Sequence, residues 1–299
     1  MFVILGASGH TGKVVAKTLL ARGQKVRVVG RSAEHLQPLA ALGAEVSAAD
    51  VTNSTALTNA FRGAEAAYVL IPPNVSDNDP LGYENRVSDS ISAAVRSAGI
   101  KYVVALSSVG ADKSSGTGPV VGLHHLEQKL SAIDGANVLF LRAGYFMENT
   151  LPQVQAIRAT GNMVGAIQPT VKLPMIATRD IGNAVTETLL RRDFQGKQTR
   201  ELLGQRDLSY GEMGSIVGKA IGMPSLKYVQ APDDQVRAAM QQMGLSPNFA
   251  SMLVEMSHAI NEGHMKPLEA RTPANTTPTS YETFVNEEFV PAFREQKAA

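Results

Sequence analysis

The chain has 299 residues, and its 44% hydrophobic and 18% charged content is that of a folded protein with a sizeable core. It carries 28 lysines and arginines against 27 aspartates and glutamates, which argues against a general nucleic-acid binder because such proteins carry a positive surplus. It has no cysteine, which excludes disulfides, thiolate metal sites and a cysteine nucleophile.

Signals for export and for membrane insertion are also missing. The sequence has no run of 18 apolar residues, so we expect no membrane-spanning helix. Its first residues have the pattern of a buried strand rather than that of a signal peptide. We therefore expect a protein of the reducing cytoplasm that binds neither a membrane nor a nucleic acid.

The first 30 residues combine a strand, a glycine-rich turn, a helix and a second strand. Met1–Leu5 is apolar, residues 6–12 read Gly-Ala-Ser-Gly-His-Thr-Gly, and Val26–Val29 is apolar again. In a dinucleotide-binding fingerprint, such glycines let the backbone approach a pyrophosphate, and the helix N-terminus offers free N–H groups. The residues that we predict to bind the pyrophosphate are Gly6, Ser8, Gly9, His10, Thr11 and Gly12.

The end of the second strand discriminates between the two nicotinamide cofactors. An NAD site usually has an acidic residue at this position, where it binds the 2′-hydroxyl of the ribose. This chain has Gly30-Arg31-Ser32 instead, and an arginine attracts the 2′-phosphate of NADP(H). We predict an NADP(H) site that uses Arg31 and Ser32. The alternative is an arginine that is merely solvated at a strand end.

Strands and helices continue to alternate up to residue 142, which predicts an α/β fold with a Rossmann-type, doubly wound parallel sheet. Ligands bind at the carboxyl ends of the strands in such sheets. Beyond the turn and Arg31, the strand-end residues that we predict to contact the cofactor are Asp50, Val51, Ile71, Pro72 and Ser107.

Beyond residue 150 the pattern changes to short helical segments broken by glycine and proline. We expect residues 1–150 to form the NADP-binding domain and residues 151–299 to form a smaller, mostly helical lobe that binds the substrate. The predicted helices cover residues 151–158, 178–189, 209–221, 233–243, 247–262 and 281–288. We expect the last six residues, 294–299, to fray.

Methionines cluster in the predicted helices of the lobe. Met240 with Met243, and Met252 with Met256, fall on single helix faces. Because methionine is flexible and polarizable, such a face adapts well to a flat aromatic molecule, but core packing of the small helical lobe is the alternative and the simpler explanation. The same two interpretations apply to our candidate substrate contacts, which are Tyr145, Phe146 and Met147. No metal is expected, since His258 and His264 lack the spacing of a zinc site.

The chain resembles the NmrA-like family of atypical short-chain dehydrogenases/reductases. The resemblance rests on the Gly-x-x-Gly-x-x-Gly turn, residues 30–32, residues 43–50, Ser107-Ser108, and Leu141–Asn149. In the C-terminal half, residues 258–263 and 276–284 are similar to bacterial members that reduce quinones or triphenylmethane dyes with NADPH. The resemblance implies that Asp50 lies beside the adenine and that parts of residues 175–205 return to complete the sheet.

One departure from this superfamily concerns the proton donor. Most short-chain dehydrogenases use a Tyr-x-x-x-Lys pair, which should fall within residues 119–127. Either Leu123 or His124 takes the lysine position there, and the tyrosine position falls on Pro119 or Val120. Reduction of a carbonyl by a phenol donor is therefore disfavoured. His124 is our candidate catalytic residue because an imidazole titrates near neutral pH; the alternative is that it only flanks a helix.

Three functions stay open. The first, which we expect, is hydride transfer from NADPH to a quinone-like or dye-like aromatic acceptor, because such acceptors take hydride readily. The second is an NADP(H)-binding, redox-sensing regulator without turnover, as the fungal founder of the family is thought to be. The third is carbonyl reduction with a substituted acid. A small aromatic substrate is the expected partner, a protein partner is expected only of the regulator, and a homodimer stays open.

Overall fold

The computed structural model describes residues 1–295, so residues 296–299 of the terminus expected to fray lie outside the described residues. Its centre is a seven-stranded sheet with the order β10-β6-β5-β4-β1-β2-β3. All pairings in this sheet are parallel. The strands are β1 Phe2–Leu5, β2 Val26–Gly30, β3 Glu45–Ala48, β4 Ala66–Val69, β5 Tyr102–Ser108, β6 Asn137–Ala143 and β10 Lys197–Leu202. The predicted Rossmann-type sheet is confirmed.

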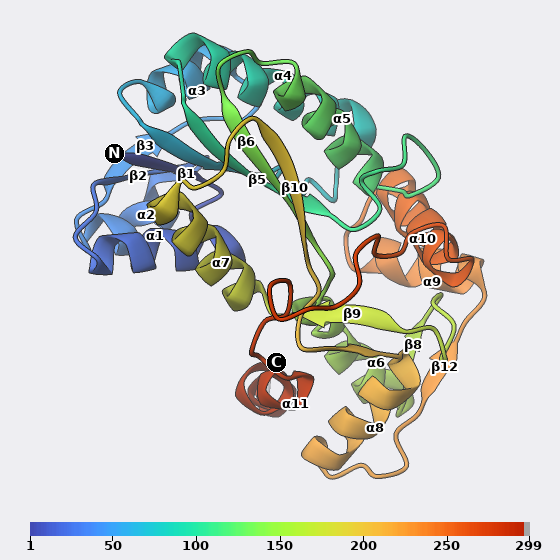
Figure 1. The fold of residues 1–299 in the computed structure, drawn as a ribbon. Coiled ribbons are helices and arrows are strands. Elements are labelled where there is room, and N and C mark those ends of the chain that lie inside the picture. Colours follow the sequence, from blue (N-terminus) through green and yellow to red (C-terminus); the bar gives the residue numbers. More distant parts are fainter. Residues whose placement is uncertain (296–299) are drawn as a thin grey trace.

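Helices cover both faces of the sheet (Figure 1). One face carries α3 Ser54–Phe61, α4 Pro80–Ala98 and α5 Val120–Ser131, and the other carries α1 His10–Ala21, α2 Ala33–Ala40 and α7 Thr178–Arg191. The residues of β1 serve these two layers alternately. Val3 and Leu5 pack in the layer of α3, α4 and α5, whereas Phe2 and Ile4 pack in the other layer. This explains why the strand is apolar throughout, as parallel strands buried on both faces are.

The chain returns to this sheet after residue 150. Helix α7 packs on α1, and β10 pairs with β6 over residues 197–202. Both elements come from the half of the sequence that otherwise forms the lobe. As a result, the carboxyl end of β10 and the segments that follow it lie close to the ends of β5 and β6 (Figure 1).

The lobe contains more β-structure than the sequence predicted. One small sheet joins β7 Tyr145–Phe146, β9 Leu173–Ile176 and β11 Arg206–Leu208, and another pairs β8 Met163–Gly165 with β12 Tyr228–Gln230. These strands have two to four residues, too few to show a period, and β9 contains Pro174. The helical elements of the lobe are α6 Gln153–Thr160, α8 Tyr210–Ile221, α9 Asp233–Gln242, α10 Pro247–Asn261, α11 Tyr281–Phe284 and α12 Val290–Arg294, with a 3-10 turn at Met147–Thr150 and a π turn at Val285–Phe289.

Within residues 1–295, no helix is both long enough and apolar enough to cross a membrane.

Candidate active site

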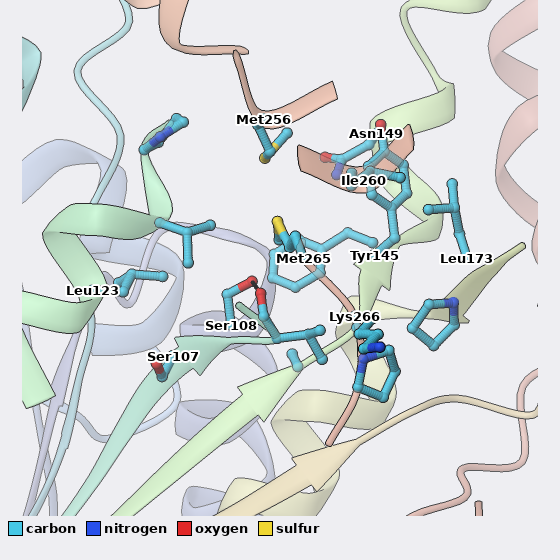
Figure 2. A pocket seen from close by; sticks show the side chains of 18 of the residues that line it. Ser107, Ser108, Leu123, Tyr145, Asn149, Leu173, Met256, Ile260, Met265 and Lys266 are labelled. Atoms are coloured by element: carbon cyan, nitrogen blue, oxygen red, sulfur yellow. Dashed lines mark hydrogen bonds between the residues drawn. The ribbon is translucent and has the colours of Figure 1, made fainter. Parts of the chain in front are cut away.

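A cavity of about 650 Å³ lies between the carboxyl ends of β4, β5 and β6 and the lobe. Figure 2 shows Ser107, Ser108 and Leu123 on one side of it and Tyr145, Met256 and Ile260 on the other. The side chains from the sheet and α5 that line it include Leu70, Ile71, Ser107, Ser108, Pro119, Val120 and Leu123. Those from the lobe include Tyr145, Phe146, Asn149, Leu173, Phe249, Met256, Ile260, Met265 and Lys266. The wall is therefore mainly apolar and aromatic.

The glycine-rich turn lies beside this cavity. Gly6 has a φ of +63°, and a Cβ there would be 3.0 Å from the side chain of Leu70, which lines the cavity. At Gly12, a Cβ would collide with the carbonyl oxygen of Gly6. Gly9 is the N-cap of helix α1 and offers no side-chain cap, and the first turn of the helix has no acidic residue. Its N-terminus therefore keeps the free N–H groups and the positive potential that favour an anion.

Two side chains of the turn point to solvent and one to the core. Ser8 and His10 are exposed. Thr11 is 5% exposed, and its hydroxyl accepts a hydrogen bond of 2.9 Å from the buried Tyr68 hydroxyl. The Thr11 side chain therefore links α1 to β4, and the contact of Thr11 with a pyrophosphate stays a prediction.

The ends of β2 and β3 bring Arg31 close to Asp50. Arg31 is exposed, and Ser32 caps α2 by accepting the His35 N–H at 3.4 Å. Hydrogen bonds from Thr52 lower the pKa of Asp50, and the nearby charge of Arg31 adds to this effect. A solvent-facing guanidinium beside a polar loop suits a phosphate-bearing ribose. Val51, in contrast, is 3% exposed and packs in the core, so its side chain offers no ligand surface.

The strand ends of β4 and β5 place two predicted residues in the cavity and one beside it. Ile71 and Ser107 line it, while the Pro72 carbonyl accepts a hydrogen bond of 3.1 Å from the Tyr83 hydroxyl. Ser107 donates its hydroxyl proton to Glu127 at 2.6 Å. The Glu127 carboxylate also accepts two hydrogen bonds from Arg142, at 2.9 and 2.6 Å. Ser107 is therefore held with its lone pairs available to accept a hydrogen bond.

Helix α5 presents an apolar face to the cavity. Pro119, Val120 and Leu123 line it, so the positions of the missing Tyr-x-x-x-Lys pair are filled by apolar groups. His124 is not among the lining residues, and its Nδ1 lies 2.9 Å from the Ala111 carbonyl oxygen, to which it donates. The structure thus directs His124 to the loop after β5 and does not bring it together with the other candidate site residues.

The lobe contributes the opposite wall. Of the three predicted substrate contacts, Tyr145 and Phe146 line the cavity, whereas Met147 is 1% exposed and packs in the core of the lobe. Burial raises the pKa of Tyr145, whose hydroxyl lies 3.0 Å from that of Tyr210. Of the two predicted methionine pairs, only Met256 reaches the cavity.

One lining residue, Glu84 of α4, escaped the sequence analysis. It is 8% exposed, and burial raises the pKa of its carboxyl to about 8. A signal for it exists in the sequence: Glu84 precedes Val87 and Ile91 by three and seven residues, so it continues the apolar stripe of the helix. A carboxyl on such a stripe marks a buried acid.

Comparison with known proteins identifies the family. The model of the NmrA-like family matches residues 1–290. The chain belongs to the NmrA-like family. The chain is 25% identical over 256 residues to the NAD(P)H azoreductase of Xenophilus azovorans, a match that covers 86% of each protein.

Two solved structures of bacterial reductases share the fold of this family member. The NADPH complex of the NADPH-dependent quinone oxidoreductase QOR2 from Escherichia coli matches with a TM-score of 0.75 and 24% identity, covering 89% of this chain and 91% of that one. The NADP(H) complex of Citrobacter sp. triphenylmethane reductase matches with a TM-score of 0.76 and 18% identity, covering 96% of this chain and all of that one, 100%.

Proposed function

We propose that this member of the NmrA-like family is an NADPH-dependent oxidoreductase that transfers hydride to a quinone-like or dye-like aromatic acceptor. The observation that carries the proposal is the mainly apolar cavity of about 650 Å³ at the carboxyl ends of β4, β5 and β6. A cavity of this size accommodates a small aromatic molecule next to a nicotinamide ring. Its position at the strand ends is where ligands of open α/β sheets bind.

The residues present fit NADPH at the phosphate groups. The uncapped N-terminus of α1 and the close approach of Gly12 to Gly6 leave room and N–H donors for a pyrophosphate. Arg31 and Ser32 hold the 2′-phosphate, and Asp50 lies at the adenosine end. Bound NADPH supplies the hydride that the acceptor receives. Three similar proteins support this assignment. The azoreductase is named for NAD(P)H, and the structures of QOR2 and the triphenylmethane reductase contain NADPH or NADP(H).

The nicotinamide end of the cavity is held by the network around Ser107. Its hydroxyl proton is committed to Glu127, which leaves an acceptor for an amide N–H of the cofactor. Arg142 fixes the Glu127 carboxylate from the other side through two hydrogen bonds. This arrangement orients a ring at the floor of the cavity without supplying a phenol or a lysine.

The walls above that floor favour a flat, electron-poor acceptor. Tyr145 and Phe146 offer aromatic surface, and Met256 and Met265 offer side chains that adapt to different ring shapes. Quinones and cationic dyes take hydride readily. They do not need the phenol proton donor whose place is taken by apolar residues of α5.

The proposal is tested by following the absorbance of reduced nicotinamide. Purified protein is mixed with NADPH, and in parallel with NADH, against benzoquinones, naphthoquinones, triphenylmethane dyes, azo dyes and simple ketones. Consumption with NADPH and a quinone or dye, and not with a ketone, is the expected result. Tight NADPH binding by calorimetry without consumption by any acceptor would contradict the enzyme and favour a regulator that only binds the cofactor.

A further inference from the structure

The carboxyl of Glu84 is buried in a small space between α4 and α5. The residue is 92% buried, with 8% of its surface exposed, and it lines the cavity. Its side chain lies against Gly122, where a Cβ would collide with Oε2. A glycine inside a helix costs about 1 kcal/mol relative to alanine. In α5 this glycine makes the space that the Glu84 carboxyl fills.

No cationic group among residues 1–295 pairs with this buried carboxyl. Within residues 1–295, its Oε2 is closed to solvent and has no hydrogen-bond partner. The charged groups of α5 are engaged elsewhere, Glu127 with Arg142 and Lys129 with Asp89. His125 is bound to the side chain of Asn85 at 2.8 Å. Helix α3, the other neighbour of α4, has no titratable side chain.

The other titratable groups that line the cavity belong to the lobe side. Lys172, Glu262 and Lys266 are exposed, and Tyr145 is held by Tyr210. With no cation against it, burial alone raises the pKa of Glu84 to about 8. The group therefore holds its proton at neutral pH, as a general acid must.

We propose that Glu84 is the general acid of this enzyme and protonates the reduced acceptor in the cavity. The inference rests on the proposed function. A quinone that takes a hydride becomes a hydroquinone monoanion, while NADPH is oxidised to NADP⁺. The Glu84 O–H bond then breaks, its proton passes to the anionic oxygen, and the neutral hydroquinone forms. The remaining carboxylate takes a proton from water when the product leaves.

Different acceptors separate this role from a structural one. A cationic triphenylmethane dye that takes a hydride at its central carbon becomes a neutral leuco dye, and no proton is consumed. A quinone needs one proton for each hydride. Loss of the Glu84 proton should therefore slow quinone reduction and leave dye reduction intact.

The experiment compares the whole protein with its Glu84→Gln variant, using NADPH with a benzoquinone and with a cationic triphenylmethane dye. We expect kcat for the quinone to fall by about 100-fold or more, the usual contribution of a general acid, and kcat for the dye to change by less than about two-fold. The kcat for quinone should decline above about pH 8 in the wild type and lose this dependence in the variant. Asp89→Asn, the same chemical change at an exposed site of α4, should alter neither reaction.

Each other outcome overturns a distinct claim. If the wild type is active and Glu84→Gln slows quinone and dye reduction equally, or slows neither, Glu84 is not the acid. If none of the acceptors tested makes the wild type oxidise NADPH, the proposed function fails, and the role of Glu84 fails with it. Thermal unfolding of each variant checks the fold. Glu84→Met, which fills the same buried space without a proton, provides the comparison if the glutamine variant does not fold.

Discussion

The two ends of the site are built by different means. The proposed cofactor end is made by the backbone of seven consecutive residues, Gly6–Gly12, and a Cβ at Gly12 would collide with the Gly6 carbonyl. The proposed acceptor end is made by side chains from α4, β5, α5, β7 and α10, and its lining residues are up to about 175 residues apart in the chain. The first arrangement resists substitution, whereas the second can change its walls one residue at a time. Changes at one end should therefore leave binding at the other end intact.

The largest expected effect concerns Glu84 at the acceptor end. The folded protein binds its proton more tightly than the unfolded chain does, since the pKa is raised from 4.5 to about 8. The stabilisation, measured relative to Glu84→Gln, is complete below about pH 4.5 and is lost as the pH rises through about 8. Each pKa unit corresponds to about 1.4 kcal/mol, so the difference in free energy of unfolding should change by about 5 kcal/mol in total.

Urea denaturation of both proteins at pH values from 4 to 9 measures this difference. A constant difference across the range would mean that Glu84 is not a buried, neutral acid. NADPH binding at neutral pH should be the same in both proteins, because the carboxyl lies at the other end of the site.

The next effect is at the cofactor end. In Gly12→Ala, the new Cβ collides with the Gly6 carbonyl and the turn must shift. We expect NADPH affinity, measured by calorimetry, to fall by about 100-fold, or about 3 kcal/mol. Gly214→Ala in α8 is the matched control, since its Cβ would make an ordinary contact of 3.5 Å. Full affinity in Gly12→Ala would show that the turn does not hold the cofactor.

A smaller effect should distinguish the two nicotinamide cofactors. Arg31→Glu places a negative charge where the 2′-phosphate is proposed to bind, and NADPH affinity should weaken by about 1–3 kcal/mol. NADH affinity should change little, because NADH has no such phosphate. Fluorescence titration with both cofactors checks this, and equal weakening for both would assign Arg31 a role that does not depend on the 2′-phosphate.

The smallest effect concerns the methionine side chains that line the cavity. Met256→Ala removes a side chain that lines the cavity, and KM for the aromatic acceptor should rise by about three- to ten-fold. The Kd of NADPH should not change. Met243→Ala is the control, because Met243 is 48% exposed and does not line the cavity. An unchanged KM in Met256→Ala would mean that the acceptor binds elsewhere.

The parts that sequence predicts well are those whose chemistry is local. The parallel sheet follows from apolar runs alternating with helical spacing, and the seven residues Gly6–Gly12 are enough to predict a dinucleotide site. Ser107 and Ile71 could be placed because strands of a parallel sheet end at one edge. The short strands of the lobe could not, since two to four residues have no readable period.

The direction in which a side chain points is what the sequence predicts poorly. One step along a helix rotates a side chain by about 100°, which places Leu123 in the cavity wall and His124 outside it. Likewise Met147 and Val51 follow residues of the predicted site and turn into the core. The sequence shows Glu84 only as a charged residue on the apolar face of a helix. That its carboxyl lines a cavity depends on tertiary packing, which the sequence does not show.

In the proposed function, hydride passes directly from NADPH to an acceptor bound in this cavity. NADPH labelled with deuterium at either face of C4 of the nicotinamide, reacted with a cationic triphenylmethane dye, tests it most directly, because the central C–H bond of the leuco dye does not exchange with water. We expect one of the two labelled cofactors to deliver its deuterium to that carbon in full. A leuco dye without deuterium from either cofactor would contradict direct transfer.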